Sequence, residues 1–242
     1  GFEIFRVVGG YKTYRTYSYE LVRKDWNLIV LGGKTGSGKT RLLKKLHKAG
    51  EQIIDLEGLA NHKGSAFGAI GQPVQPSVEQ FENEFAETLQ NLDPEKPSWV
   101  ENESRKIGRL ILPDKFYHQM LVSPLIDIYK TDQERIDLIK KEYASLPQDE
   151  LILAVLRIKK RLGGLRTSQA IQAIIDGNHE DWISNMLIYY DKAYTFDLDK
   201  HPEGKTIQLD LSGIDEDKAT QILLEAKSQF YGKYTYPTDR VE

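Results

Sequence analysis

The stretch LIVLGGKTGSGKTRLLKKL, residues 28–46, decides the fold of this chain. Its first four residues form an apolar, β-prone run, and its last six have the pattern of a helix. Between them, residues 33–40 match the Walker A pattern in the strand, loop and helix context that this motif requires. The sequence therefore predicts a phosphate-binding loop, placed between a strand and a helix of an α/β fold.

Each part of this loop has a predicted role. Its glycines let consecutive backbone N–H groups and the N-terminus of the following helix point at one anion. Lys39 adds a mobile positive charge, and Thr40 is placed to ligate Mg²⁺. The predicted phosphate-binding residues are Gly33, Lys34, Thr35, Gly36, Ser37, Gly38, Lys39 and Thr40. ATP, GTP or a small-molecule diphosphate would each satisfy this loop.

Apolar runs alternate with helix-like segments from residue 27 onward, which is typical of a parallel sheet built from βα units. Helices are expected over 77–92 and 133–143. The expected strands are 28–31, 52–56, 99–100, 125–129 and 207–211. Residues 148–194 have helical patterning without a strand candidate and predict an inserted helical subdomain or lid. The fold class is therefore α/β, a P-loop NTPase-like parallel sheet flanked by helices, with its core in 25–147 and 195–242.

Two short segments precede this core. Residues 2–8 are an apolar, β-prone run that ends at Gly9-Gly10, and residues 16–24 have the pattern of a short helix. Neither segment makes a domain by itself. We therefore treat 1–24 as a separate unit at the start of the chain.

Composition narrows the possible functions. The 242 residues include no cysteine, which excludes a disulfide framework, thiolate metal sites and a nucleophilic thiol within them. No apolar run approaches the length of a membrane span, so the composition favours a cytoplasmic protein without a membrane partner. The net charge of -3 gives no overall attraction to nucleic acid, and RNA binding would depend on local basic patches.

One basic patch stands out in the sequence. It consists of Arg157, Lys159, Lys160, Arg161 and Arg166, within ten residues that contain no acid. Such a segment can contact a tRNA backbone, or donate arginines to phosphates as kinase lids do. A solvated helix face is the third interpretation, and the sequence does not choose among the three.

Carboxylates follow the second and third expected strands. Because ligands of open parallel sheets gather at the carboxyl ends of the strands, these side chains are candidates for catalysis or for a Walker B role. The predicted catalytic residues are Asp55, Glu101, Glu103 and Arg105, and the predicted Mg²⁺ ligands are Thr40 and Glu101. The alternative is that these carboxylates cap loops or pair with Arg105.

The segment 58–68 is too polar and too rich in glycine for a core element, and it starts at the edge of the sheet where ligands bind. We therefore predict a substrate loop. The residues assigned to it are Glu57, Asn61, His62, Lys63, Gly64 and Ser65. His62 is a candidate base or phosphate ligand, although a lone histidine in a loop is more often solvated.

Four stretches of the sequence resemble the tRNA 2-selenouridine synthase family. They are residues 9–15, the P-loop, residues 55–68 and residues 99–108, in the family's order and spacing. Residues 160–164 and 190–194 are weaker matches further along the chain. The long loop after Asp55 is the most diagnostic part, because a Walker A element alone is not specific.

The resemblance implies a modification of 2-thiouridine at the tRNA wobble position in two stages. The thiouridine would be S-geranylated from geranyl diphosphate, and selenium from selenophosphate would then replace the geranylthio group. Family members carry a rhodanese-like domain before the P-loop domain. Residues 1–15 resemble its last strand and turn, and 1–24 would be its remnant and a linker. Its catalytic cysteine has no counterpart here, so we expect only the first stage from these residues.

A prenyl chain would need an apolar slot beside the P-loop. Phe67, Phe116, Tyr117 and Met120 are the candidates, and the alternative is that these side chains belong to the core. Two other functions fit the same motifs: a small-molecule kinase, and a non-catalytic tRNA-binding platform whose P-loop senses nucleotide. A kinase would turn over ATP with an added acceptor, and a platform would leave geranyl diphosphate intact.

Overall fold

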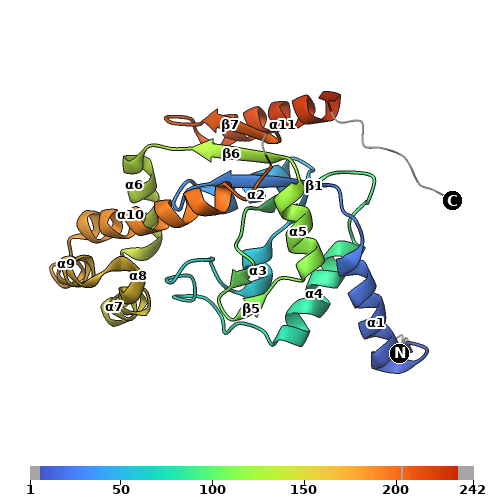
Figure 1. Cartoon of the computed structure of the whole chain (residues 1–242), viewed down its shortest axis with the longest axis horizontal. Coiled ribbons are helices and arrows are strands. Elements are labelled where there is room, and N and C mark those ends of the chain that lie inside the picture. The colour runs from blue at the N-terminus through green and yellow to red at the C-terminus, as the bar shows by residue number, and fades with distance from the viewer. Residues whose placement is uncertain (1–5, 203, 234–242) are drawn as a thin grey trace.

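Five parallel strands form the central sheet of the computed structural model, which describes residues 6–202 and 204–233 (Figure 1). In the order of the sheet, the strands are β2 (Gln52–Ile54), β3 (Ser98–Glu101), β1 (Leu28–Gly33), β6 (Leu125–Tyr129) and β7 (Thr206–Asp210). All five expected strands are present, and the predicted fold class is confirmed. The sequence did not predict the antiparallel pair β4 (Lys106–Ile107) and β5 (Leu110–Ile111).

Strand β1 lies at the centre of the sheet, and all six of its residues are buried. Because side chains alternate along a strand, Leu28 and Val30 pack on one face while Ile29 and Leu31 pack on the other. The first face is covered by α1 (Gly10–Arg23), α3 (Leu56–Ala60), α4 (Val78–Gln90) and α5 (Asp114–Val122). The second face is covered by α2 (Lys39–Lys48) and α11 (Glu216–Lys233).

Side-chain caps fix the starts of α4 and α6. The Ser77 hydroxyl accepts a hydrogen bond from the Gln80 amide at 3.1 Å, so α4 begins where the sequence predicts. Helix α6 (Asp132–Tyr143) begins one residue earlier than expected. The cause is a capping box, in which the Thr131 hydroxyl and the Glu134 carboxylate each accept a bond from the other residue's amide.

Four helices occupy the insertion, at the end of the sheet toward which the arrows of β6 and β7 point (Figure 1). They are α7 (Gln148–Arg157), α8 (Lys159–Leu162), α9 (Gly164–Ile175) and α10 (His179–Leu198). Helix α10 extends four residues beyond the expected boundary at 194. Their core includes Phe67 of the predicted substrate loop and Ile70 just after it, so the insertion and the end of that loop form one packed unit. None of the described helices, α10 included, is long and apolar enough to cross a membrane.

The N-terminal segment differs from the expectation. Residues 10–15, expected to belong to a strand and turn, are the first half of α1, which reaches Arg23. That expectation is wrong for these six residues because Leu21 and Val22 bury one side of a continuous helix against the core. Arg15 holds its N-terminal half to α4 through Asn83, at 2.6 Å. Residues 1–5 of the expected strand lie outside the described residues.

Candidate phosphate and metal site

The P-loop joins the carboxyl end of β1 to the N-terminus of α2. Gly36 and Gly38 have φ values of 82° and 86°, which side chains rarely adopt. A Cβ on Gly36 would also lie 2.8 Å from Cδ1 of Ile139, so only glycine fits there. Lys39 Nζ donates to the Gly33 carbonyl at 2.7 Å and holds its charge over the loop. The loop lines a cavity of about 230 Å³ at the sheet edge, here called the phosphate pocket.

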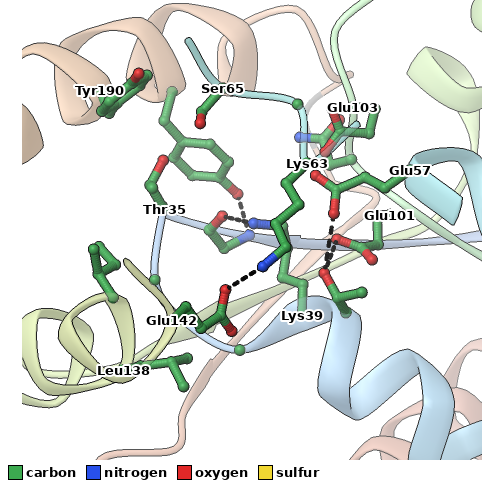
Figure 2. A pocket seen from close by; sticks show the side chains of 18 of the residues that line it. Thr35, Lys39, Glu57, Lys63, Ser65, Glu101, Glu103, Leu138, Glu142 and Tyr190 are labelled. Atoms are coloured by element: carbon green, nitrogen blue, oxygen red, sulfur yellow. Dashed lines mark hydrogen bonds and ion pairs between the residues drawn. The ribbon is translucent and has the colours of Figure 1, made fainter. Parts of the chain in front are cut away.

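Three carboxylates meet beside this loop. Glu57, Glu101 and Glu103 each offer an oxygen atom, and these atoms lie within 4.8 Å of one another. The Thr40 hydroxyl lies 3.3 Å from both Glu57 Oε2 and Glu101 Oε2. Figure 2 shows the three carboxylates on one side of the pocket, with Thr35, Leu138 and Tyr190 on the other. The ends of β2 and β3 and the start of α2 thus converge on a single set of oxygen atoms.

Burial shifts the titration of this cluster. It raises the pKa of Glu57 and of Glu101 to about 8 and that of Glu103 to about 7, and neighbouring carboxylates push all three in the same direction. Lys39 opposes the shift of each, because its charge stabilises the ionised form. The cluster therefore favours a partner that brings positive charge.

The donor set fits Mg²⁺. Carboxylate and hydroxyl oxygens are the protein ligands that this ion takes, and Thr40 with Glu57, Glu101 and Glu103 supplies both kinds. Glu101 Oε1 is buried without a hydrogen-bond partner among the described residues, although buried polar atoms are normally satisfied. A cation beside it would satisfy that atom.

Part of the predicted substrate loop covers the cluster. Gly64 has a φ of 65°, and a Cβ there would lie 2.7 Å from Glu103 Oε2 and 3.0 Å from Glu57 Oε1. Lys63 and Ser65 also line the pocket, and Lys63 Nζ pairs with Glu142 on α6 at 3.0 Å. Residues 63–65 therefore line the phosphate pocket beside the carboxylates, and their role as a substrate loop stays a prediction.

Tyr194 of α10 also lines the phosphate pocket, a contact that the sequence did not predict. Its hydroxyl accepts from the Gly33 amide at 2.6 Å and donates to the Asp127 carboxylate in the middle of β6. Burial and the Asp127 carboxylate raise the pKa of Tyr194 far above its usual range, so the phenol keeps its proton. The hydroxyl ties the insertion to the first residue of the P-loop.

Asp191, one turn earlier on α10, makes a second contact between the insertion and the P-loop. It pairs with Lys34 at 3.1 Å and with Arg135 of α6, whose guanidinium is almost fully buried. Arg135 Nε donates to the Thr35 carbonyl at 2.8 Å. Lys34 is therefore held toward the insertion, and Lys39 is the P-loop lysine that lines the phosphate pocket.

Several predicted site residues lie elsewhere. Asp55 caps α3 by accepting from the Gly58 amide at 2.8 Å, and the Asn61 side chain donates to the Val74 carbonyl at 3.2 Å. His62 is buried against the loop and hairpin backbone rather than solvated, and burial lowers its pKa. Arg105 pairs with Asp114 on a different cavity. In this structure the capping alternative holds for Asp55, whereas Arg105 pairs with Asp114 and not with a strand-end carboxylate.

The basic segment does not reach the phosphate pocket in this conformation. Arg157, Lys159, Lys160 and Arg161 are exposed on α7 and α8, and Arg166 is half-buried on α9. Arg161 donates to the Tyr189 hydroxyl at 3.1 Å. The segment thus lies on the surface of the insertion, where contact with tRNA and a solvated helix face are the two interpretations.

An apolar slot of about 40 Å³ adjoins the phosphate pocket. Phe67, Trp182, Met186 and Leu187 line it, and the rings of Phe67 and Trp182 stack with centroids 5.6 Å apart. Thr35, Ser65, Ile139, Tyr143 and Tyr190 line both cavities. The helical spacing of Trp182, Met186 and Leu187 was the available signal in the sequence, but nothing local shows which way that face points.

The other prenyl-slot candidates belong to the core. Phe116 and Met120 are fully buried on the first face of the sheet, and Tyr117 packs against the same cluster. Helix α5 places them there because its apolar positions turn toward β1. Only Phe67 of the four lines the slot.

A family model described as the tRNA 2-selenouridine synthase AAA domain matches residues 26–216. The tRNA 2-selenouridine synthase of Sulfurovum sp. (strain NBC37-1) is 35% identical over 234 residues, covering 83% of this chain and 63% of that protein. The one from Marinobacter nauticus is 36% identical over 227 residues, covering 79% and 60%. The chain thus spans somewhat under two thirds of these relatives. A solved tRNA isopentenylpyrophosphate transferase from Bacillus halodurans aligns with a TM-score of 0.41 and 12% identity, covering 86% of this chain and 100% of that one.

Proposed function

This chain belongs to the tRNA 2-selenouridine synthase family, and from that premise we propose that its phosphate pocket binds geranyl diphosphate for transfer to tRNA. The acceptor is the sulfur of 2-thiouridine at the wobble position. The chain is then the P-loop part of a tRNA-modifying transferase.

The observation that carries this proposal is the apolar slot beside the phosphate pocket. A prenyl diphosphate has one end that needs the P-loop and another that needs an apolar wall, and the two cavities share five lining residues. The slot volume of about 40 Å³ holds only part of a geranyl chain, so side chains must move on binding. Met186 has the flexibility to do so.

The diphosphate would be held by the P-loop amides, the N-terminus of α2 and Lys39. Thr40, Glu57 and Glu101 would hold Mg²⁺, with Glu103 beside them. When bound, the ion neutralises charge on the diphosphate leaving group. Nothing in this arrangement requires hydrolysis of a nucleotide.

In the transfer step, the thiouridine sulfur forms a bond to C1 of the geranyl group. The bond between C1 and the diphosphate oxygen breaks, and its electron pair leaves with the diphosphate. The base loses its N3 proton, and the carboxylate of Glu103, which lies beside the proposed Mg²⁺ ligands, is the candidate acceptor. Lys39 stabilises the negative charge that develops on the leaving oxygen.

We assign the second stage, exchange of the geranylthio group for selenium from selenophosphate, to a rhodanese-like domain. The family resemblance calls for a cysteine there, and these 242 residues contain none. That domain would act as part of a longer chain or as a separate subunit. Its partners in the proposed pathway are the same tRNA and this P-loop unit.

The test is to incubate the chain with thiolated tRNA, geranyl diphosphate and Mg²⁺, and to analyse the nucleosides by mass spectrometry. We expect S-geranyl-2-thiouridine, and no 2-selenouridine after selenophosphate is added. Absence of the geranylated nucleoside, together with ATP turnover on an added acceptor, would move the assignment to a small-molecule kinase. Detection of 2-selenouridine would refute the division between the two stages.

A further inference from the structure

A groove beside α1 has the opposite charge character to the phosphate pocket. This α1 groove has a volume of about 470 Å³ and is lined by α1, the start of α4 and residues 105 and 111–115. Its charged lining residues are four cations and two carboxylates, namely Arg15, Arg23, Arg105, Lys115, Glu82 and Asp114. Those of the phosphate pocket are three cations and five carboxylates, namely Lys39, Arg41, Lys63, Glu57, Glu101, Glu103, Glu142 and Asp197.

The α1 side of the groove carries an exposed aromatic ring in contact with two guanidinium groups. Arg15, Tyr19 and Arg23 lie four residues apart and so share one face of the helix. The guanidinium carbons of Arg15 and Arg23 lie 5.4 and 5.1 Å from the centre of the Tyr19 ring, which is 45% exposed. Exposed aromatic rings and arginine planes are the surfaces on which unpaired RNA bases stack.

Two cations of the groove, Arg105 and Lys115, make exposed ion pairs that a bound anion could replace. Arg105 pairs with Asp114, and Lys115 pairs with Asp25 at 2.9 Å, in side chains that are about half exposed or more. Such surface pairs contribute little stability, so a phosphate group can replace the carboxylate at small cost. An anionic polymer would meet more cations than carboxylates here, whereas it would meet more carboxylates than cations in the phosphate pocket.

The groove also adjoins the transfer site. Glu103 and Ser104 line the phosphate pocket, and the next residue, Arg105, lines the groove. Consecutive Cα atoms are about 3.8 Å apart, so one short segment separates the two cavities. Figure 1 shows α1 beside α4, on the side of the molecule away from α7, α8 and α9.

We propose that the α1 groove binds single-stranded RNA of the substrate tRNA, with phosphates on Arg23 and Arg105 and a base on Tyr19. A nucleotide bound there lets its neighbour turn into the phosphate pocket. The inference rests on the proposed function, because it takes tRNA as the polymer. Helix α1 lies outside residues 26–216, so the family match assigns it no role.

The first experiment measures binding of thiolated tRNA to the 242-residue chain by fluorescence anisotropy over a range of salt concentrations. The test variant combines Arg23→Glu and Arg105→Glu, and the control combines Lys44→Glu and Lys48→Glu on the exposed side of α2. Both change the net charge by the same amount. We expect the groove variant to lose about tenfold in affinity and to show a salt slope shallower by about 2, and the control to change about twofold or less.

A second pair of variants tests stacking. Tyr19→Leu is expected to weaken RNA binding about fivefold without changing the salt slope, since no charge is lost. Tyr17→Leu is the matched control, because Tyr17 is equally exposed on α1 but lines neither cavity. Binding of geranyl diphosphate should stay at the wild-type value in all four variants, which excludes a loss of folding.

Equal loss of RNA affinity in the groove and control variants would overturn the proposal, as would equal effects of Tyr19→Leu and Tyr17→Leu. Unchanged RNA affinity in every groove variant would also overturn the proposal. The groove would then be assigned to a protein partner instead of RNA. The proposed function fails separately: a wild-type chain that binds tRNA through the groove but transfers no geranyl group would refute the transferase and retain the RNA site.

Discussion

The phosphate pocket and the α1 groove lie on either side of residues 103–105 and have opposite chemistry. The pocket gathers buried carboxylates whose pKa values are raised to about 7 and 8. The groove gathers three arginines, of which Arg15 pairs with Glu82 and the half-exposed Arg105 pairs with Asp114. Under the two proposals, this separation would let a chain with a net charge of -3 bind a polyanion. RNA would bind in the groove, and a small diphosphate with its cation would bind in the pocket.

The largest effect is expected for Lys39→Ala, which should affect ligand binding in the phosphate pocket but not in the α1 groove. Lys39→Ala should weaken binding of geranyl diphosphate about 100-fold or more, because a charge-assisted bond to phosphate is lost. Its affinity for tRNA should not fall. Calorimetry with the diphosphate and anisotropy with tRNA measure the two. The control is Lys34→Ala, whose amine pairs with Asp191 and should cost much less. Unchanged diphosphate affinity in Lys39→Ala would contradict the P-loop assignment.

The wall of the pocket on α10 should give a smaller effect. Tyr194→Phe leaves the Gly33 amide without its acceptor and Asp127 without its donor. We expect KM for geranyl diphosphate to rise about tenfold, because the P-loop loses a buried hydrogen bond that fixes its first residue. Tyr189→Phe is the matched control on the same helix, since its hydroxyl meets only the exposed Arg161 among the described contacts. Equal kinetics of the two variants would show that the hydrogen bonds of the Tyr194 hydroxyl do not position the P-loop.

Prediction from the sequence succeeded where the signal is local. The P-loop and the five strands follow from the Walker A motif and from periodicity. The rule that ligands gather at the carboxyl edge of a parallel sheet placed Glu101 and Glu103 beside the P-loop, and their roles there stay predictions. Arg105 was misplaced because the chain turns away from the pocket after Ser104, and no local pattern marks that turn.

The insertion was predicted as helical, but its contribution to the site was not. Tyr194 and Gly33 are 161 residues apart, and a contact at that separation is set by how α10 packs rather than by any pattern near either residue. The apolar slot has the same origin, because it exists only where Phe67 of the loop meets Trp182 of α10. Long-range packing therefore supplied both the contact of Tyr194 with the P-loop and the apolar slot.

The acid cluster should make the metal-free protein less stable as pH rises. The folded-state pKa values of about 8, 8 and 7 exceed the unfolded value near 4.3, so between these limits the unfolded state binds fewer protons and the free energy of unfolding falls. We expect Tm to drop by about 5 °C from pH 5 to pH 8 through this cluster. Mg²⁺ should reduce the drop, because it stabilises the ionised carboxylates.

The matched variants for this prediction are Glu101→Gln and Glu142→Gln. Glu101→Gln removes one buried titrating group and should flatten the dependence of Tm on pH. Glu142 lines the same pocket beside Lys63, and Glu142→Gln should leave that dependence unchanged. Thermal melts with and without Mg²⁺ at several pH values measure both. A slope in Glu101→Gln equal to that of the wild type would show that this carboxyl titrates normally.

The smallest expected effect concerns the basic segment on the insertion, which lies across the molecule from α1 (Figure 1). Charge reversal of Lys159, Lys160 and Arg161 should weaken tRNA binding about threefold and make its salt slope shallower, because fewer counterions are released. The effect should be smaller than that of the groove variant. The charges of this segment are exposed, and its described contacts include no aromatic ring packed against two guanidinium groups, as Tyr19 is in the groove. Anisotropy under the same salt series measures it. A loss larger than that of the groove variant would make the insertion the main RNA surface and reverse the comparison. Wild-type affinity and slope would leave the segment as a solvated helix face and the α1 groove as the RNA site.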